Sequence, residues 1–201
     1  MTCSSVHREI ESHAATRGDR PALLGAGAPL SYRDLNQRAN GLARRLIGSG
    51  LRRGSIVVVR MEKSSNAVMV LLAILKAGAA SMWIDPGDGS SWPYVVSITD
   101  GGTAEEQRYR ALDLTAAFAE APSGPNLPIV TRPTDIACVL SQGNGSPGVL
   151  VPHETITLLQ AQPIPESAWW SGDAGAIELW IALMAGATVS LTDSPAHAAA
   201  A

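Results

Sequence analysis

The stretch SQGNGSPGVLVPH, residues 141–153, has the glycine spacing of a loop that wraps backbone N–H groups around a phosphate. Gly143, Gly145 and Gly148 lie with Pro147 in one short run between two apolar segments. A phosphate loop usually carries a cation, because phosphate brings dense negative charge, and this stretch has neither lysine nor arginine. The residues therefore leave three interpretations open: a nucleotide site, the remains of one, or a turn.

The remaining polar residues predict neither a metal site nor a catalytic residue. The histidines are scattered along the chain, and His153, at the start of a helical segment, is typical of a packed or surface side chain. Asp173 precedes another helical segment, where an aspartate caps a helix start well. Cys3 and Cys138 are too few for a disulfide or metal framework, so we expect free thiols in a reducing cytoplasm.

Composition excludes several classes of function. The chain of 201 residues is 46% hydrophobic and 16% charged, which is a globular balance, and its net charge is −3. It has no lysine and arginine run of the kind that binds nucleic acid or a membrane surface. The longest apolar run, residues 67–75, is too short to span a bilayer, and the N-terminus lacks the apolar stretch of a signal peptide. We therefore expect a cytoplasmic globular protein.

Hydrophobic periodicity predicts an α/β fold with a mostly parallel sheet flanked by helices. We expect helices over 6–16, 31–48 and 64–77, strands over 56–61 and 79–85, and a short hairpin over 22–30. Ser31 opens a capping-box pattern, and Gly78 stops the third helix. The strand, helix and strand between residues 56 and 85 form a βαβ unit, whose two strands are parallel.

The second half of the chain carries weaker patterns. We expect a helix over 105–121, a strand over 135–141, a strand and helix over 148–162, and a helix, a glycine stop and a strand over 174–191. Residues 86–104 predict a loop, as does the region of Trp169 and Trp170. One domain is expected over residues 1–193, followed at 194–201 by a disordered tail or a cloning remnant.

Four segments in the same order resemble the adenylate-forming enzymes, above all the amino-acid-activating adenylation domains of nonribosomal peptide synthetases. LSYRDLNQRANGLARRL (30–46) and LLAILKAGAASMWIDP (71–86) resemble the first two signatures of that family, the second being usually L-K-A-G-x-A-Y-V-P-I-D-P. VLSQGNGSPGVLVPH (139–153) lies where the family has its phosphate loop, and GDAGAIELWIALMAGATVSL (172–191) resembles the next segment. The resemblance covers residues 6–191 and implies the N-terminal part of an adenylation core.

The phosphate-loop position departs from the family pattern, which is roughly Y-T-S-G-[ST]-T-G-x-P-K-G. Two positions that carry hydroxyl side chains in the family are occupied by Gly143 and Asn144, and the lysine is missing. The resemblance implies a degenerate phosphate loop made of Ser141, Gly143, Asn144, Gly145, Pro147 and Gly148. The alternative is a glycine-rich connection that still links two strands.

Asp173 matches an aspartate that pairs with the α-ammonium group of the substrate in the amino-acid-activating branch. We therefore consider Asp173 a remnant of that contact, since a carboxylate opposite a cation selects amino acids well. Its neighbours differ from the family: Gly172, Gly175 and Ile177 replace an aromatic residue, a serine and a tryptophan, which reshapes the pocket wall. Capping of the following helix remains the alternative.

The segment LKAGAA resembles a surface where many relatives bind a small MbtH-like helper protein. The resemblance implies a partner contact at Leu75, Ala77, Gly78, Ala79 and Ala80, whose small side chains would let an aromatic ring approach closely. The alternative is that these residues pack a helix end against the sheet. We expect as partners an MbtH-like protein, neighbouring condensation or carrier domains, or a second copy of the chain, and neither nucleic acid nor a membrane.

The phosphate-loop position lacks its donors, and the family's later signatures do not follow Leu191. These two departures predict a truncated, catalytically inactive adenylation-like domain. We expect it to serve as a structural or protein-binding platform in a nonribosomal peptide pathway. No catalytic residue, metal or cofactor is expected in that case. The alternative is half of a split amino-acid-activating enzyme, completed by another chain and using ATP and Mg²⁺. A decayed remnant is a third hypothesis, against which the consistent caps, periodicity and glycine stops argue.

Overall fold

The strands of this chain form two sheets. The structure, a computed structural model, describes residues 5–25, 28–84, 96–99, 112–113, 124–141, 148–160, 167–170 and 176–191, and both sheets are given for these residues. The larger sheet has the order β6 (Leu112–Asp113), β5 (Val96–Thr99), β3 (Ile56–Arg60), β4 (Ala80–Trp83), β7 (Ile136–Leu140) and β8 (Val149–Pro152). The smaller sheet has the order β2 (Leu30–Ser31), β1 (Pro21–Leu24), β10 (Thr188–Ser190) and β9 (Ser167–Trp169).

Both sheets are parallel except at one edge each. β8 runs antiparallel to β7 and β2 runs antiparallel to β1, whereas the other described pairs are parallel. The described helices are α1 (Val6–Thr16), α2 (Tyr32–Gly48), α3 (Ser65–Lys76), α5 (His153–Leu159) and α6 (Ile177–Met184). The predicted mostly parallel, helix-flanked α/β fold is therefore confirmed, with two sheets in place of the single one expected.

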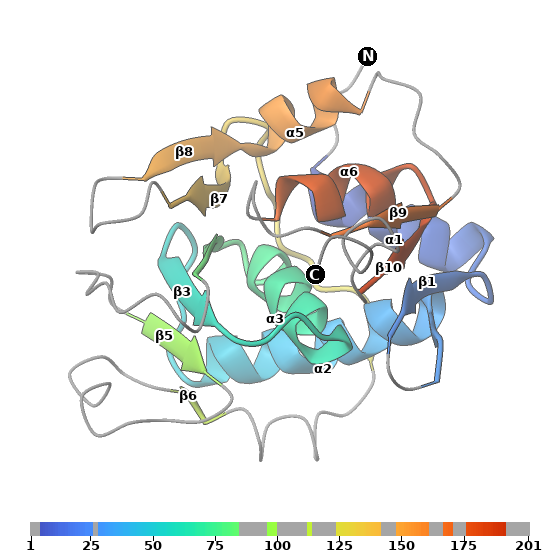
Figure 1. The fold of residues 1–201 in the computed structure, drawn as a ribbon. Helices are drawn as coiled ribbons and strands as arrows, with labels where there is room; N and C mark the ends of the chain where they lie inside the picture. Colours follow the sequence, from blue (N-terminus) through green and yellow to red (C-terminus); the bar gives the residue numbers. More distant parts are fainter. Residues whose placement is uncertain are drawn as a thin grey trace.

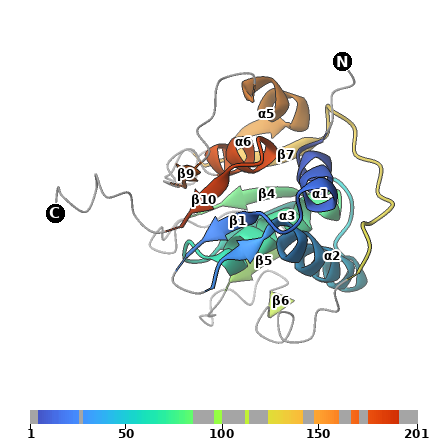
Figure 2. The same cartoon turned by 90° about the vertical axis from the view of Figure 1, so that its right-hand side faces the viewer.

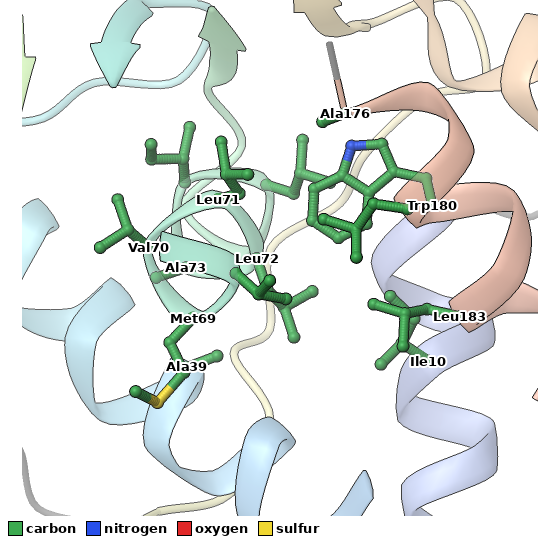
Figure 3. Close-up of a cluster of buried hydrophobic side chains, with 14 of the residues drawn as sticks. Ile10, Ala39, Met69, Val70, Leu71, Leu72, Ala73, Ala176, Trp180 and Leu183 are labelled. Atoms are coloured by element: carbon green, nitrogen blue, oxygen red, sulfur yellow. The ribbon is translucent and has the colours of Figure 1, made fainter. Parts of the chain in front are cut away.

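Helix α3 lies between the two sheets and is buried almost throughout (Figure 1). Every side chain from Ala67 to Lys76 is buried. A helix that is apolar on all sides needs neighbours on all sides, and α1 and α2 supply two of them (Figure 2). In Figure 3, Trp180 of α6 points toward α3 beside Leu71 and Leu72. The core of the protein is thus built around one helix.

The helix boundaries follow the capping and glycine signals in the sequence. The Oγ of Ser31 accepts the N–H of Asp34 at 3.1 Å at the start of α2, as its capping-box pattern predicts. The Oγ of Ser64 accepts the N–H of Ala67 at 3.2 Å at the start of α3. The chain leaves α3 through Gly78 at a φ of +76°, a left-handed conformation that glycine adopts without strain.

Three predictions about elements are wrong or incomplete. Val96–Thr99, expected in a loop, form β5 and pair in parallel with β3. Leu112 and Asp113, expected inside a helix, form β6 and pair in parallel with Ile98 and Thr99 of β5; the rest of 105–121 lies outside the described residues. Trp169, expected in a loop, ends β9. In each case two to four residues form a strand because a distant strand pairs with them, which local periodicity does not encode.

A buried ion pair joins α1 to the end of α3. The Nζ of Lys76 lies 2.6 Å from the Oε1 of Glu11, and the two side chains are 0% and 6% exposed. Arg8 also donates to Glu11, at 2.8 Å to Oε2. Burial lowers the pKa of Lys76 to about 8, against the opposing attraction of Glu11. The only charged residue of α3 is therefore tied to the neighbouring helix α1.

None of the described helices has both the length and the apolarity needed to cross a bilayer.

Replacing Glu11 with Gln should leave the Lys76 ammonium buried without a counter-ion, and the free energy of unfolding should fall by about 3–5 kcal/mol in urea titrations at pH 7. The exposed pair of Arg33 and Asp19 is the control, because Asp19→Asn should cost less than about 1 kcal/mol. The double variant Glu11→Leu with Lys76→Met should recover most of the loss. Equal losses of unfolding free energy in Glu11→Gln and Asp19→Asn would show that the buried pair stabilises the protein no more than the exposed pair does.

Candidate functional site

The carboxyl ends of the parallel strands from both sheets meet at one edge of the molecule. Trp83 ends β4 of the larger sheet, and Trp170 follows β9 of the smaller one. Their ring centroids lie 4.8 Å apart at 62°, an edge-to-face contact that joins the two sheets. Both indoles are buried, at 9% and 3% exposure. In open α/β sheets this edge is where ligands bind, so we place the candidate site here.

A cavity of about 410 Å³ opens on this edge beside the start of α3. Its walls combine the ends of β1 and β10, the helix α2 and the turn between β3 and α3: Gly25, Ala28, Leu30, Arg38, Lys63, Ser64, Ser65, Asn66, Met69 and Leu191. The N–H of Leu191 donates to the carbonyl of Leu24 at 2.8 Å and holds the ends of β1 and β10 together. The cavity therefore depends on both sheets meeting α3.

The described lining of the cavity is positive. Arg38 and Lys63 contribute two cations, and none of the lining residues that the structure describes is acidic. The N-terminus of α3 adds the partial positive charge of its first N–H groups. Neither cation was predicted as a site residue from the sequence. One sequence signal could have indicated Lys63: it directly precedes the serine that caps a strongly apolar helix. The N-terminus of a helix is where α/β folds place anion contacts.

The predicted degenerate phosphate loop connects β7 to β8. Ser141 directly follows β7 and Gly148 directly precedes β8, and Leu140 pairs with Val149, so the two ends of the loop lie side by side. Gly143, Asn144, Gly145 and Pro147 lie outside the described residues. The stretch is therefore a connection between two antiparallel strands, and a phosphate-binding role at its tip stays a prediction.

Gly148 has a packing reason to be glycine. A Cβ at this position would come within 2.5 Å of the Cγ1 of Val139 and 2.7 Å of the carbonyl oxygen of Leu140. Distances below 3.0 Å are not tolerated without movement of the chain. The close approach of β8 to β7 thus accounts for this glycine without any nucleotide.

Asp173 lies outside the described residues, in the segment 171–175. That segment connects Trp170 to Ala176, the N-cap of α6. Trp170 contacts Trp83 of β4, and β4 pairs with β7, the strand that ends at the phosphate-loop position. The segments that hold Asp173 and the degenerate loop therefore both begin at the edge where the parallel strands have their carboxyl ends.

The predicted partner-contact residues lie at the end of α3 and the start of β4. Leu75, Ala77, Ala79 and Ala80 are buried within the chain, and Gly78 is half-buried beside Arg53 and Ile129. This is the arrangement of the packing alternative, in which the small residues bring a helix end against the sheet. Contact with a helper protein stays a prediction, for which Gly78 is the most accessible of the five.

His153 is a packed side chain at the start of α5. It is 1% exposed, and its Nδ1 accepts the N–H of Val6 at 3.2 Å. The thiol of Cys138 is also buried, which raises its pKa to about 12 and makes it a poor nucleophile. Within the described residues, no three His, Cys, Asp or Glu side chains gather in the manner of a metal site.

Comparison with known proteins agrees with this geometry. The model of the AMP-binding enzyme family matches residues 10–118. The chain belongs to the AMP-binding enzyme family. It is 30% identical to surfactin synthase subunit 2 of Bacillus subtilis over 92% of its own length, and 33% identical to tyrocidine synthase 1 of Brevibacillus parabrevis over 92%. It covers only 6% and 20% of those two proteins.

Solved structures of this family share the fold. The N-terminal subdomain of Klebsiella oxytoca NpsA, in complex with 3-hydroxyanthranilyl-AMSN, superposes with a TM-score of 0.78 at 23% identity, over 98% of this chain and 56% of that one. VinN in complex with L-aspartate gives a TM-score of 0.78 at 18% identity, over 96% and 58%. The resemblance inferred from the four sequence segments is thereby confirmed, and the chain corresponds to part of an adenylation domain of the nonribosomal peptide synthetase type.

Substituting Gly148 with Ala should destabilise the protein by about 1–3 kcal/mol, because the new methyl group overlaps Val139 and Leu140. The matched control is Gly48→Ala at the end of α2, where a Cβ meets nothing within 4 Å and stability should be unchanged or slightly raised. Thermal unfolding of both variants measures the difference. Equal melting temperatures for the two variants would remove the packing explanation for Gly148.

Proposed function

We propose that this chain forms part of an amino-acid-type adenylation fold that does not catalyse adenylation on its own and serves as a structural or protein-binding platform in nonribosomal peptide synthesis. One observation carries the first half of the proposal: residues 141–153, at the position of the family's phosphate loop, contain no lysine or arginine. A triphosphate needs concentrated positive charge and several donors at that loop.

The packing of Gly148 supports this proposal. A glycine at the phosphate-loop position is evidence for a nucleotide site only if the nucleotide is the reason for the glycine. Here the approach of β8 to Val139 and Leu140 is a sufficient reason. The loop position is thus compatible with a chain in which selection preserves the fold and not the reaction.

Exposed apolar side chains support the platform half of the proposal. The β8–α5 surface comprises Val149, Leu150, Leu158 and Leu159, which are between 45% and 72% exposed on two consecutive elements (Figure 1). β8 is also the last strand of its sheet, with one side unpaired by the other described strands. Edge strands and exposed leucines favour association. The partners we propose are an MbtH-like protein, a neighbouring condensation or carrier domain, or a second copy.

The positive cavity favours the alternative, half of a split amino-acid-activating enzyme. Arg38 and Lys63 lie on the same edge as the phosphate-loop position and could meet an anionic group if another chain completed the site. ATP and Mg²⁺ would then supply the activated phosphate. The described residues hold no cluster of carboxylates of their own for the metal, so in this alternative the completing chain and the nucleotide would hold it.

Calorimetric titration of the chain with MgATP should give no binding heat, and amino-acid-dependent pyrophosphate exchange should stay at background, because the phosphate-loop position lacks its cation. Exchange by the chain alone would contradict the proposal. Exchange that appears only with a partner chain would favour the split enzyme. In that case Arg38→Ala and Lys63→Ala should lower it about tenfold or more, while Arg52→Ala, outside the cavity, should not.

Association should depend on the β8–α5 surface. We expect size-exclusion chromatography with light scattering to show self-association at high concentration, or a co-purifying partner, and the double variant Leu150→Gln with Leu158→Gln should weaken either one. Val130→Gln is the control, because Val130 is as exposed as Leu158, at 71% against 72%, but lies outside this surface. A monomer at every concentration, with no partner, would contradict the platform proposal.

A further inference from the structure

The first turns of α1 dock onto α3 and α5 through polar side chains that are shut off from solvent. Ser5, His7 and Glu11 come from α1 and its N-cap, Lys76 from α3, and His153 from α5. These five residues are between 1% and 6% exposed. Buried polar groups are stable only while each has a suitable partner, so the docking of α1 depends on the partners that these five side chains keep.

The hydrogen bond to His153 defines one of those states. The backbone N–H of Val6 donates to Nδ1 of His153 at 3.2 Å. An N–H group can only donate, so Nδ1 carries no proton while this contact exists. A protonated imidazole has an N–H at both ring nitrogens and would set two donors against each other. Docking of the start of α1 therefore requires a neutral His153.

The second histidine lies beside the first. The rings of His7 and His153 contact edge-to-face with centroids 5.8 Å apart. The Oγ of Ser5 lies 3.4 Å from Nε2 of His7. Two imidazolium ions at this separation inside the protein would repel each other strongly.

The charged groups around the pair are mostly cations. Burial lowers the pKa of His7 well below its ordinary value, and His153, Lys76 and Arg8 add to the effect. Burial lowers the pKa of His153 to about 4, although the carboxylate of Asp135 acts in the other direction. That carboxylate is already engaged by the guanidinium of Arg53 at 2.6 Å, and Glu11 is engaged by Lys76 and Arg8.

We propose that this junction is an acid-sensitive latch, in which protonation of His153 and His7 releases the first turns of α1 from α3 and α5. The far end of α1 has its own anchor, because Nε2 of His13 donates to the carbonyl of Met184 on α6 at 2.7 Å. Release therefore begins at Val6. It exposes the buried Ile10 and the ion pair of Glu11 and Lys76, and with them one side of α3.

The direction of the pH effect follows from the two states of His153. When α1 is released, the imidazole regains its ordinary pKa of about 6.5, whereas in the docked state the pKa is about 4. The released state therefore binds more protons between these values. Docking is complete above about pH 6.5 and weakens as the pH falls toward 4. From pH 7 to pH 5, His153 alone shifts the opening equilibrium about twentyfold, and His7 adds to this.

Amide hydrogen exchange of the whole chain, measured by NMR and corrected for the intrinsic rates, tests the latch. The protection factors of Val6, Arg8 and Glu9 should fall at least about twentyfold between pH 7 and pH 5. Those of Leu42, in the middle of α2, should change less than about twofold, which is the internal control. Equal falls at both places would mean global unfolding and would overturn the proposal.

Two variants separate titration from packing. His153→Asn keeps an acceptor for the Val6 N–H without a titrating group, so with His7→Gln the fall in protection should disappear. His153→Ala should show low protection at Val6 at both pH values. A double variant that keeps the wild-type fall would overturn the proposal. If the variants do not fold, the imidazole titration of His153 in the wild-type chain decides: a pKa near 6.5 with α1 still protected overturns it, and a pKa near 4 supports it.

Discussion

The complete burial of α3 is the constraint on which the rest of the structure depends. Its side chains from Ala67 to Lys76 are apolar but for the last, and all of them are buried. Such a helix cannot lie on the surface of a sheet, so it requires a second layer on its far side. The smaller sheet, α1, α2 and α6 provide that layer, and Lys76 at the end of α3 fixes α1 through Glu11. The smaller sheet and three helices thus follow from one helix that has no solvent face.

The same constraint explains what could be predicted from the sequence. The apolar run of α3, the cap at Ser31 and the glycine at Gly78 are local signals, and each has its expected place. The hairpin of β1 and β2 and the strand β10 were predicted as separate elements, but not as one sheet, because they join only when β10 pairs with β1. β9 was missed, because it is three residues long and becomes a strand only by pairing with β10. β6 was missed for the same reason. Elements defined by contact with distant segments leave no periodicity to detect.

The candidate site shows the same division between local and distant information. The missing lysine in residues 141–153 is visible in the sequence, and so is the resemblance of the segment to a phosphate loop. The positive cavity was not predicted, because Arg38 and Lys63 are separated in sequence and share a wall only where β1 and β10 end beside the start of α3. The contact of Trp83 with Trp170 likewise exists only when the two sheets meet. Local patterns therefore indicated the departure from the phosphate-loop motif more readily than the shape of the cavity.

Motif residues in this chain divide into those that packing requires and those that only chemistry would require. Gly148 is needed because β8 approaches Val139, and Ala77, Ala79 and Ala80 are buried where the chain passes from α3 into β4. Lys76, in the same signature, neutralises Glu11 inside the protein. None of these residues is evidence for catalysis, because each would persist in any chain that keeps the fold. The informative positions are those without a packing role, and the absent lysine after Pro147 is one of them.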